Sequence, residues 1–340
     1  MDSVYFNEPI DEVLSHYDYE ILKVRNECYK IKKGVWWIET EGGYKILKKV
    51  PNSEEDLKFI LSAVNHLTAN GVNIPFVNKT WDDKEYVNIN RACYTLLDAV
   101  DGRNPSYNSP EELMMVVKGL AKFHKASSGF SINHECKPKD HLGTWVEEYE
   151  EQIENMKVFY EKVKSSEEKT AFDELVINEF PYFYEKAKGT INNLNSKEYR
   201  GWVEKVKASG NLCHQDFASG NLIINSKGLF VLDLDGISFD IPARDIRKLF
   251  NKIMKQKGNW NDTLAKEIID YYQSENPLIK DEWLVVKYDL MFPHLFIGAM
   301  SKYYYKHDGD WTQKKYYKRL KEMIDFEKTK IDLFKNYSFE

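Results

Sequence analysis

The residues whose types and spacing could do chemistry lie in one stretch, residues 211–245. Asp216 and Asn221 stand in a polar segment, and Asp233 follows a short apolar run. A carboxylate can orient or deprotonate an attacking hydroxyl group, and carboxylate and amide oxygens are the ligands that magnesium prefers beside phosphates. We therefore assign Asp216 as a catalytic base, and Asn221 and Asp233 as magnesium ligands.

A β-hairpin must position these side chains. The apolar runs 222–224 and 229–232 flank the turn residues 225–228, which predicts two paired strands. The hairpin would fold Asp233 back toward the polar segment. The alternative is a hairpin whose carboxylates are simply solvated, although a core strand has no need of acids at its end. Asp235 is either a ligand of a second magnesium ion or a solvated acid.

The order of these residues resembles a known family. His214, Asp216 and Asn221 form His-x-Asp-x-x-x-x-Asn, and an Asp-x-Asp begins at Asp233. This pattern is similar to the aminoglycoside phosphotransferase and choline kinase branch of the protein-kinase-like fold. The resemblance implies that Asp245 braces the catalytic loop. We expect His214 to support the loop by packing and hydrogen bonds, and not to act as a base.

The resemblance also implies the fold class, which is α+β. We expect a two-lobed protein-kinase-like fold, with a small antiparallel β lobe that carries one helix, and a larger, mainly helical lobe. The domain prediction is a nucleotide-binding lobe at 1–98, a hinge at 99–103 and a helical lobe at 104–340. Strand-like patterns at 19–25, 34–40 and 44–50, a helical pattern at 53–70 and mostly helical patterns after residue 103 agree with this division.

ATP is the cofactor that the resemblance implies. Lys48 ends the third strand-like run and resembles the strand lysine that contacts the nucleotide phosphates in this family; Lys45 is the alternative. The segment around Leu97 and Ala99 resembles the linker whose main-chain groups hydrogen-bond the adenine edge.

Two features depart from the protein kinase pattern. The expected loop at 26–34 has one glycine where protein kinases have Gly-x-Gly-x-x-Gly, and Lys32 and Lys33 could take over part of the phosphate binding. The acids at 54–56 all fall in the first turn of the predicted helix, where they favour the helix dipole. Either one of them reaches Lys48, or the usual lysine–acid pair is missing.

Composition limits the remaining classes of function. The chain has 340 residues and a net charge of −6, which disfavours nucleic acid as a partner. It has no apolar run of membrane-spanning length and an acidic N-terminus unlike a signal peptide, so we expect neither membrane insertion nor export. The four cysteines lack Cys-x-x-Cys spacing and are expected to be free thiols, with Cys213 buried and not a nucleophile.

A closer resemblance spans nearly the whole chain. The stretches 59–71, 101–103, 120–124, 291–296 and 301–305 are similar to the spore-coat kinase-like proteins of the CotS type. This resemblance implies synthesis in the mother-cell cytoplasm, a place in the spore coat and other coat proteins as partners.

We therefore expect a small-molecule kinase, an ATP- and magnesium-dependent phosphotransferase that acts on a hydroxyl group and is associated with spore coat formation. Its acceptor pocket should lie between the lobes, lined by helices after residue 130. The alternative is a catalytically weak or inactive kinase-like structural protein of the spore coat. A protein kinase is disfavoured because the interval from Asp233 to Asp245 is too short for an activation loop and no Ala-Pro-Glu segment follows.

Overall fold

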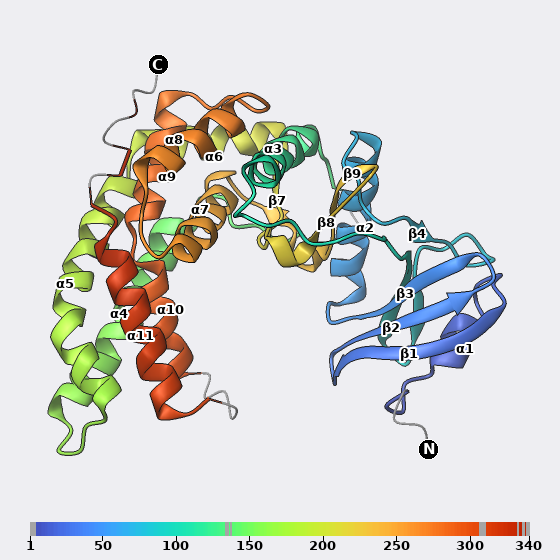
Figure 1. The fold of residues 1–340 in the computed structure, drawn as a ribbon, viewed down its shortest axis with the longest axis horizontal. Helices are drawn as coiled ribbons and strands as arrows, with labels where there is room; N and C mark the ends of the chain where they lie inside the picture. Colours follow the sequence, from blue (N-terminus) through green and yellow to red (C-terminus); the bar gives the residue numbers. More distant parts are fainter. Residues whose placement is uncertain are drawn as a thin grey trace. The chain divides into compact units, whose positions relative to one another are not determined.

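The structure is a computed structural model that describes residues 5–132, 136, 138–305, 311–331, 333–334 and 337. The chain forms two compact units, and Figure 1 colours it along the sequence. The first unit contains Met1–Asp140 and His214–Phe239, and the second contains His141–Cys213 and Asp240–Glu340. These units are not the two expected lobes, because the first unit continues past residues 99–103 and includes the catalytic-loop segment. The lobes and the hinge remain a prediction.

The first unit is built on an antiparallel sheet with the strand order β1-β2-β3-β6-β4, in which β5 also pairs with β6. Buried and half-buried residues alternate along β2, so that Trp36 and Ile38 face a core shared with Leu47, Tyr94 and Leu96. The strands are β1 (Ile21–Lys30), β2 (Lys33–Thr40), β3 (Gly43–Val50), β4 (Val77–Asn78), β5 (Val87–Ile89) and β6 (Ala92–Asp98).

The turn between β1 and β2 differs from the prediction. The expected loop at 26–34 is wrong, because β1 extends to Lys30 and β2 begins at Lys33, which leaves a two-residue turn at 31–32. A Cβ atom on Gly34 would lie 2.2 Å from the indole ring of Trp36. This glycine therefore makes room for a buried tryptophan, which explains why the turn needs no further glycine.

The described part of the first unit also contains the α-helices α1 (Ile10–Leu14), α2 (Glu54–Ala69) and α3 (Pro110–Ser127). Helix α2 begins with a capping box in which Ser53 and Asp56 bind each other's backbone N–H groups, and it buries an apolar stripe that includes Leu57 and Leu61. Helix α3 buries Phe123, whose ring lies 6.1 Å from that of Phe217 in the catalytic segment. The predicted helix at 53–70 is thus confirmed. Helix α3 packs against the catalytic segment through Phe123 and Phe217.

The segment that follows β6 is bound tightly to the hairpin of β8 (Leu222–Asn225) and β9 (Gly228–Val231). Arg103 and Ile224 exchange backbone hydrogen bonds of 3.2 and 2.8 Å. Gly102 has a φ of +143°, and a Cβ atom there would lie 2.5 Å from the carbonyl oxygen of Ile224. Asn104 donates to the carbonyl oxygens of Ser219 and Leu222. These contacts fix the hairpin against the end of the sheet.

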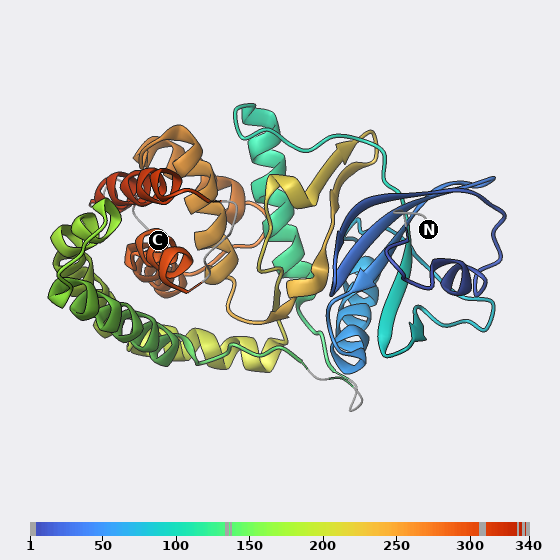
Figure 2. The same ribbon diagram turned by 90° about the horizontal axis from the view of Figure 1, so that it is seen from below.

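The second unit is helical in its described part. Helices α4 and α5 lie side by side, as do α10 and α11 (Figure 1, Figure 2). Pro181 lies inside α5, which continues through it. The helices are α4 (Trp145–Ser165), α5 (Ala171–Leu194), α6 (Lys197–Ser209), α7 (Ala243–Lys257), α8 (Asp262–Gln273), α9 (Lys280–Met291), α10 (His294–Tyr304) and α11 (Gln313–Lys328).

The sequence prediction of an α+β chain with an antiparallel N-terminal sheet and a mostly helical remainder is confirmed. Within the described ranges, none of the helices is both long enough and apolar enough to cross a membrane.

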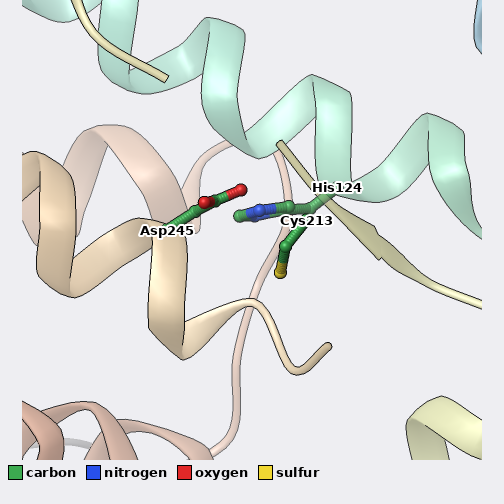
Figure 3. Close-up of side chains that lie close together, drawn as sticks. All are labelled: His124, Cys213 and Asp245. Carbon is green, nitrogen blue, oxygen red and sulfur yellow. The ribbon is translucent and has the colours of Figure 1, made fainter. Parts of the chain in front are cut away.

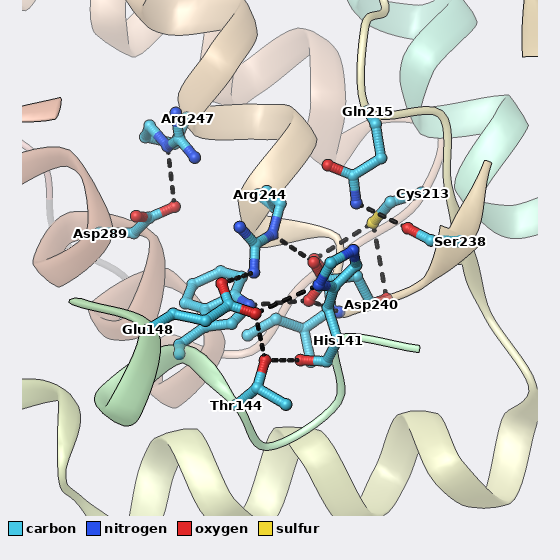
Figure 4. A network of polar contacts seen from close by, with 12 residues as sticks. His141, Thr144, Glu148, Cys213, Gln215, Ser238, Asp240, Arg244, Arg247 and Asp289 are labelled. Atoms are coloured by element: carbon cyan, nitrogen blue, oxygen red, sulfur yellow. Dashed lines mark hydrogen bonds and ion pairs between the residues drawn. The ribbon is translucent and has the colours of Figure 1, made fainter. Parts of the chain in front are cut away.

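Buried ion pairs hold the second unit together (Figure 4). Asp240 accepts hydrogen bonds from the indole of Trp145 and the guanidinium of Arg244, and Arg244 also binds Glu148 at 3.1 Å. Burial would raise the pKa of Glu148, but hydrogen bonds from His141 and Thr144 and the charge of Arg244 lower it to about 2. Glu148 therefore stays ionised.

A second buried group centres on Asp289, which is fully buried in α9. Its carboxylate binds Arg247 at 3.1 Å, the hydroxyl of Tyr149 at 2.6 Å and Nε2 of His294 at 2.7 Å. Burial and the nearby charge of Arg247 lower the pKa of His294 to about 3. His294 is therefore neutral at physiological pH and donates to Asp289.

Candidate active site

The hairpin delivers Asp233 at the end of β9 in an unusual backbone conformation. Asp233 has a φ of +55°, in the left-handed region that a residue other than glycine seldom adopts. Just before it, the backbone N–H of Leu232 donates to the carbonyl oxygen of Asn221 at 2.9 Å. Such conformations persist where the surrounding structure enforces them, which is common at functional sites. One backbone bond of the hairpin thus links Asn221 to Leu232, the residue that precedes Asp233.

The histidine of the catalytic segment links its two halves. His214 is fully buried, its Nδ1 accepts from the backbone N–H of Asp216 at 3.2 Å, and its Nε2 lies 3.0 Å from the carbonyl oxygen of Leu232. Because Nδ1 accepts, the ring carries its hydrogen on Nε2 and donates to Leu232. His214 thereby ties the Asp216 backbone to the residue that precedes Asp233, and neither ring nitrogen is available as a base.

Gln215 is the other strained residue of this segment, with a φ of +70°. Its side-chain amide donates to the hydroxyl of Ser238 at 2.8 Å, a contact drawn in Figure 4. The side chain of Gln215 is thus turned toward Ser238, which leaves the neighbouring Asp216 carboxylate exposed.

Asp216 and Asn221 are in direct contact. The amide nitrogen of Asn221 donates to the carboxylate Oδ2 of Asp216 at 3.0 Å and to its carbonyl oxygen at 2.9 Å. The nitrogen of Asn221 is therefore used to hold Asp216, and its amide oxygen is the atom that Asn221 can offer to a metal. The structure brings the proposed base and one proposed metal ligand together.

Four charged side chains meet beside them, which we call the charge quartet: Lys33, Lys48, Asp233 and Asp235. Lys48 Nζ lies 2.6 Å from one carboxylate oxygen of each aspartate, and Lys33 Nζ lies 3.2 Å from the other oxygen of each. Asp235 is thus not an isolated solvated acid. Its carbonyl oxygen also accepts from Lys139 at 2.7 Å.

The lysines of the quartet control the ionisation of Asp233. Burial would raise the pKa of Asp233, but the charge and hydrogen bond of Lys48, followed by the charge of Lys33, hold this pKa well below its usual value. Conversely, burial would lower the pKa of Lys33, and the charges of Asp235 and Asp233 raise it. Asp233 and Lys33 therefore both carry their charge near neutral pH.

The quartet lies at one end of a cavity of about 730 Å³ in the first unit, a volume typical of small-molecule sites. Asn221 also lines it, whereas Asp216 is not among its lining residues in the described part of the chain. The rest of the wall is mostly apolar and includes Val35, Ile46, Val77, Leu97, Ile223 and Leu232.

The predicted nucleotide residues are placed as follows. Lys48 and Leu97 line the cavity, and Leu97 lies in β6 opposite Ile46. The backbone N–H of Ala99 donates to the carbonyl oxygen of Tyr44 at 3.0 Å, so this donor is already used within the sheet. Lys45, the alternative to Lys48, binds Asp98 at 2.6 Å and is not one of the described residues that line the cavity.

The first-turn acids of α2 have partners other than Lys48. Glu54 accepts from the hydroxyl of Tyr86 and the amide of Asn88, and Asp56 caps its own helix. The ammonium group of Lys48 is bound by the two aspartates of the quartet. Neither Glu54 nor Asp56 therefore forms the lysine–acid pair with Lys48 that is usual in protein kinases.

Asp245 and Cys213 belong to the second unit. Figure 3 shows their side chains close together. Both are buried, Asp245 in the first turn of α7 and Cys213 at the end of β7 (Leu212–Cys213). Burial raises the pKa of the Cys213 thiol well above its usual value, and its Sγ lies 3.3 Å from the carbonyl oxygen of Ile241. Cys213 is thus a buried thiol, as predicted, while the bracing role of Asp245 remains a prediction.

Sequence reasoning missed part of the site. It gave Lys33 together with Lys32 as a residue that could take over part of the phosphate binding, and it did not connect Asp235 with any lysine. The position of Lys33 directly after a tight hairpin turn was the available signal, but it requires the correct strand ends. Lys139 and Asn104 lie in segments without a regular pattern, so no signal pointed to them.

Comparison with known proteins identifies the family. The family model described as "Spore coat putative kinase YutH" matches residues 14–337. Spore coat protein S of Bacillus subtilis (strain 168) is 28% identical over 321 residues, which cover 94% of this chain and 91% of that protein. The predicted resemblance to spore-coat kinase-like proteins is therefore confirmed.

Solved structures show the same fold. An aminoglycoside phosphotransferase from Alicyclobacillus acidocaldarius subsp. acidocaldarius DSM 446 aligns with a TM-score of 0.79 at 17% identity, covering 96% of this chain and 94% of that one. Spectinomycin phosphotransferase, solved in complex with ADP and spectinomycin, aligns with a TM-score of 0.65 at 14% identity, covering 94% and 97%. The fold is that of the kinase-like phosphotransferases, and the chain belongs to the YutH family of spore coat kinase-like proteins.

Proposed function

We propose that the protein is an ATP- and magnesium-dependent phosphotransferase that acts on a hydroxyl group of a small molecule. The observation that carries this proposal is that Lys48, Asn221 and Asp233 line one and the same cavity, whose remaining wall is mostly apolar. The family match to spore coat kinase-like proteins and the fold shared with small-molecule phosphotransferases support it.

The donor atoms at the quartet fit a magnesium ion. Asn221 and Asp233 offer an amide oxygen and a carboxylate to the same cavity, and magnesium prefers such hard oxygen ligands. When bound, magnesium would neutralise part of the phosphate charge. Lys48 would hold phosphate oxygens, and Leu97 with its apolar neighbours would enclose the adenine ring. The carbonyl oxygen of Ala99 would serve the adenine edge, since its N–H is used by Tyr44.

Asp216 would position the acceptor hydroxyl and accept its proton. Its carboxylate is exposed, and Asn221 fixes one of its oxygens at 3.0 Å, so the carboxylate is held in one orientation. Asn221 would therefore serve both the metal and the base. His214 would keep the backbone of Asp216 in place, and Asp245 would brace the loop.

Magnesium-dependent ATP binding and hydrolysis by the wild type, Asp216→Asn and Asp233→Asn test this proposal. We expect Asp216→Asn to bind nucleotide like the wild type and to lose turnover by about 100-fold or more. Asp233→Asn should weaken metal–nucleotide binding. A wild-type protein that binds no ATP at millimolar magnesium would exclude the proposed activity.

A second candidate function is a catalytically weak or inactive kinase-like protein of the spore coat. The observation that favours it is the engagement of Glu54 and Asp56 elsewhere, which leaves Lys48 without a partner from these two acids. Nucleotide binding with no turnover in the presence of many hydroxyl acceptors would support this alternative.

The family's coat relatives also support a location. We propose that the protein is made in the mother-cell cytoplasm and associates with other coat proteins, as the name of spore coat protein S suggests for that relative. Fractionation of sporulating cells with an antibody against this chain tests this, and signal confined to vegetative cytoplasm would contradict it.

A further inference from the structure

A lysine that lines the cavity directly follows the turn between β1 and β2. Lys33 is the first residue of β2, and its Nζ lies 3.2 Å from a carboxylate oxygen of Asp233 and of Asp235. Lys33 also lines the cavity, whereas its neighbour Lys32 is exposed and is not among the described lining residues. The structure thus separates the two turn lysines and places only Lys33 at the site.

The backbone of this turn is committed to the sheet. Tyr29 pairs with Gly34 and Lys30 pairs with Lys33, so the ladder continues to the last residues before the two-residue turn. Gly34 makes room for the ring of Trp36, and its φ is not in the left-handed region. A glycine-rich loop would offer several backbone N–H groups to phosphates. Here, the residues that flank the turn are paired within the sheet, and the group that this strand end presents at the cavity is the side chain of Lys33.

The charge quartet is balanced as it stands, with two ammonium groups against two carboxylates. A divalent cation that approached alone would have to displace ammonium groups from Asp233 and Asp235. A polyphosphate that approached alone would draw Lys33 and Lys48 away and would then face two unpaired carboxylates. Both arrangements place like charges together, which is unfavourable in a partly desolvated site.

Metal and polyphosphate together remove this conflict. The carboxylates can bind the cation while the ammonium groups bind phosphate oxygens, so every charge has an opposite partner. Lys33 is suited to such a change of partner because its side chain is 36% exposed and extends from the edge of a turn. Its bonds to the aspartates are longer than those of Lys48, at 3.2 against 2.6 Å.

We propose that Lys33 is a phosphate-binding residue whose ammonium group changes partner from Asp233 and Asp235 to the nucleotide phosphates, and that this exchange makes metal binding and nucleotide binding mutually dependent. The inference rests on the proposed function, since it concerns the same cavity. It assigns to one side chain the role that backbone amides have in a glycine-rich loop.

The test compares Lys33→Gln with the wild type in two binding measurements. Electron paramagnetic resonance measures the binding of Mn²⁺ alone, and calorimetry measures the binding of ATP at saturating Mg²⁺ with no acceptor present. We expect Lys33→Gln to bind Mn²⁺ alone about tenfold more tightly, because one competing ammonium group is gone. We expect it to bind ATP with Mg²⁺ about tenfold more weakly, because one charged phosphate contact is lost.

Lys32→Gln is the matched control, since it removes the same charge one residue away. It should change both dissociation constants by less than about twofold, as expected for a solvent-exposed charge. Circular dichroism should show that both variants are folded, because each replaced side chain is at least partly exposed.

The two effects of opposite sign separate the outcomes. If Lys33→Gln binds both Mn²⁺ alone and ATP with Mg²⁺ more tightly than the wild type, Lys33 only competes with the metal. Its role in phosphate binding is then excluded. If it changes neither, or changes both as Lys32→Gln does, the whole inference fails while the proposed function stands. If the wild type binds no ATP with Mg²⁺, the proposed function fails and the inference fails with it.

Discussion

The ion pairs of the cavity and those of the second unit both join aspartates to cationic side chains, but in different surroundings. In the quartet, Lys48 is 12% exposed and its partner Asp233 is 36% exposed. In the second unit, Arg247 is 9% exposed and its partner Asp289 is completely buried. Solvent access decides what each can do, because a partly exposed charge can change partner at small cost and a buried charge cannot. The first arrangement suits ligand binding, and the second suits a permanent scaffold.

Removing one member of the buried arrangement should have the largest effect on folding. Asp289→Ala would leave the guanidinium of Arg247, the hydroxyl of Tyr149 and the ring of His294 without their shared acceptor. We expect a loss of about 3–5 kcal/mol in unfolding free energy, since an uncompensated buried charge remains. Urea denaturation followed by circular dichroism measures it.

The control is Asp233→Ala in the quartet. Because its pairs are partly exposed, the unfolding free energy should change by less than about 1 kcal/mol. Equal destabilisation by the two variants would show that burial does not distinguish the two arrangements.

The pH dependence of stability should also differ between the two regions. His294 has a folded-state pKa of about 3, lowered by burial and then by Arg247, against about 6.5 in an unfolded chain. Below pH 6.5, His294 is therefore protonated in the unfolded chain but stays neutral in the folded protein. The free energy of unfolding falls as the pH falls toward 3. Between pH 6.5 and 4.5 this contribution should amount to about 2 kcal/mol.

The effect of His294 must be isolated by comparison, because Asp240 acts in the opposite direction. Burial raises the pKa of Asp240 to about 6 despite the charge of Arg244, so its contribution is lost as the pH rises through 6. Subtracting the profile of His294→Gln from that of the wild type removes the Asp240 part. A difference that does not change between pH 6.5 and 4.5 would contradict the assignment of His294 as a buried neutral base.

The regular elements could be predicted from the sequence where the local pattern and the tertiary structure agree. Helix α2 is an example, since its cap at Ser53 and its apolar stripe both reflect local rules. Pro181 shows the limit, because proline usually ends a helix but α5 continues through it. The ends of β1 and β2 were also missed, since polar residues such as Lys30 and Lys33 pair there through their backbones. Side-chain patterns do not report such pairing.

The candidate site also contains residues that the sequence could predict and residues that it could not. Asp216 and Asn221 belong to one short segment, so the sequence could indicate that they lie close together, and the structure shows their side chains in contact. Lys33 and Asp235 are 202 residues apart, and no local rule connects them. The left-handed conformation of Asp233 could not be predicted either, because aspartate does not indicate a positive φ as glycine does.

Replacing a quartet acid should affect binding more than stability. Asp233→Asn keeps the size of the side chain but removes the charge that a metal would need. We expect the affinity for ATP in the presence of Mg²⁺ to fall by about 10- to 100-fold, with little change in thermal stability. Calorimetric titration at several magnesium concentrations measures this. Unchanged affinity would show that Asp233 does not serve the metal.

The smallest expected effect concerns Asp235, which either positions the two lysines of the quartet or binds a second metal ion. Its carboxylate is bound by Lys48 and Lys33, but its side chain is less exposed than that of Asp233, at 19% against 36%. If it mainly positions the lysines, Asp235→Asn should weaken ATP binding by only about two- to fivefold, because amide oxygens still accept from both ammonium groups. One Mn²⁺ per protein–nucleotide complex should bind in both the variant and the wild type. A second Mn²⁺ that is present in the wild type and lost in the variant would instead make Asp235 a metal ligand. Both aspartates of the quartet would then bind metal ions.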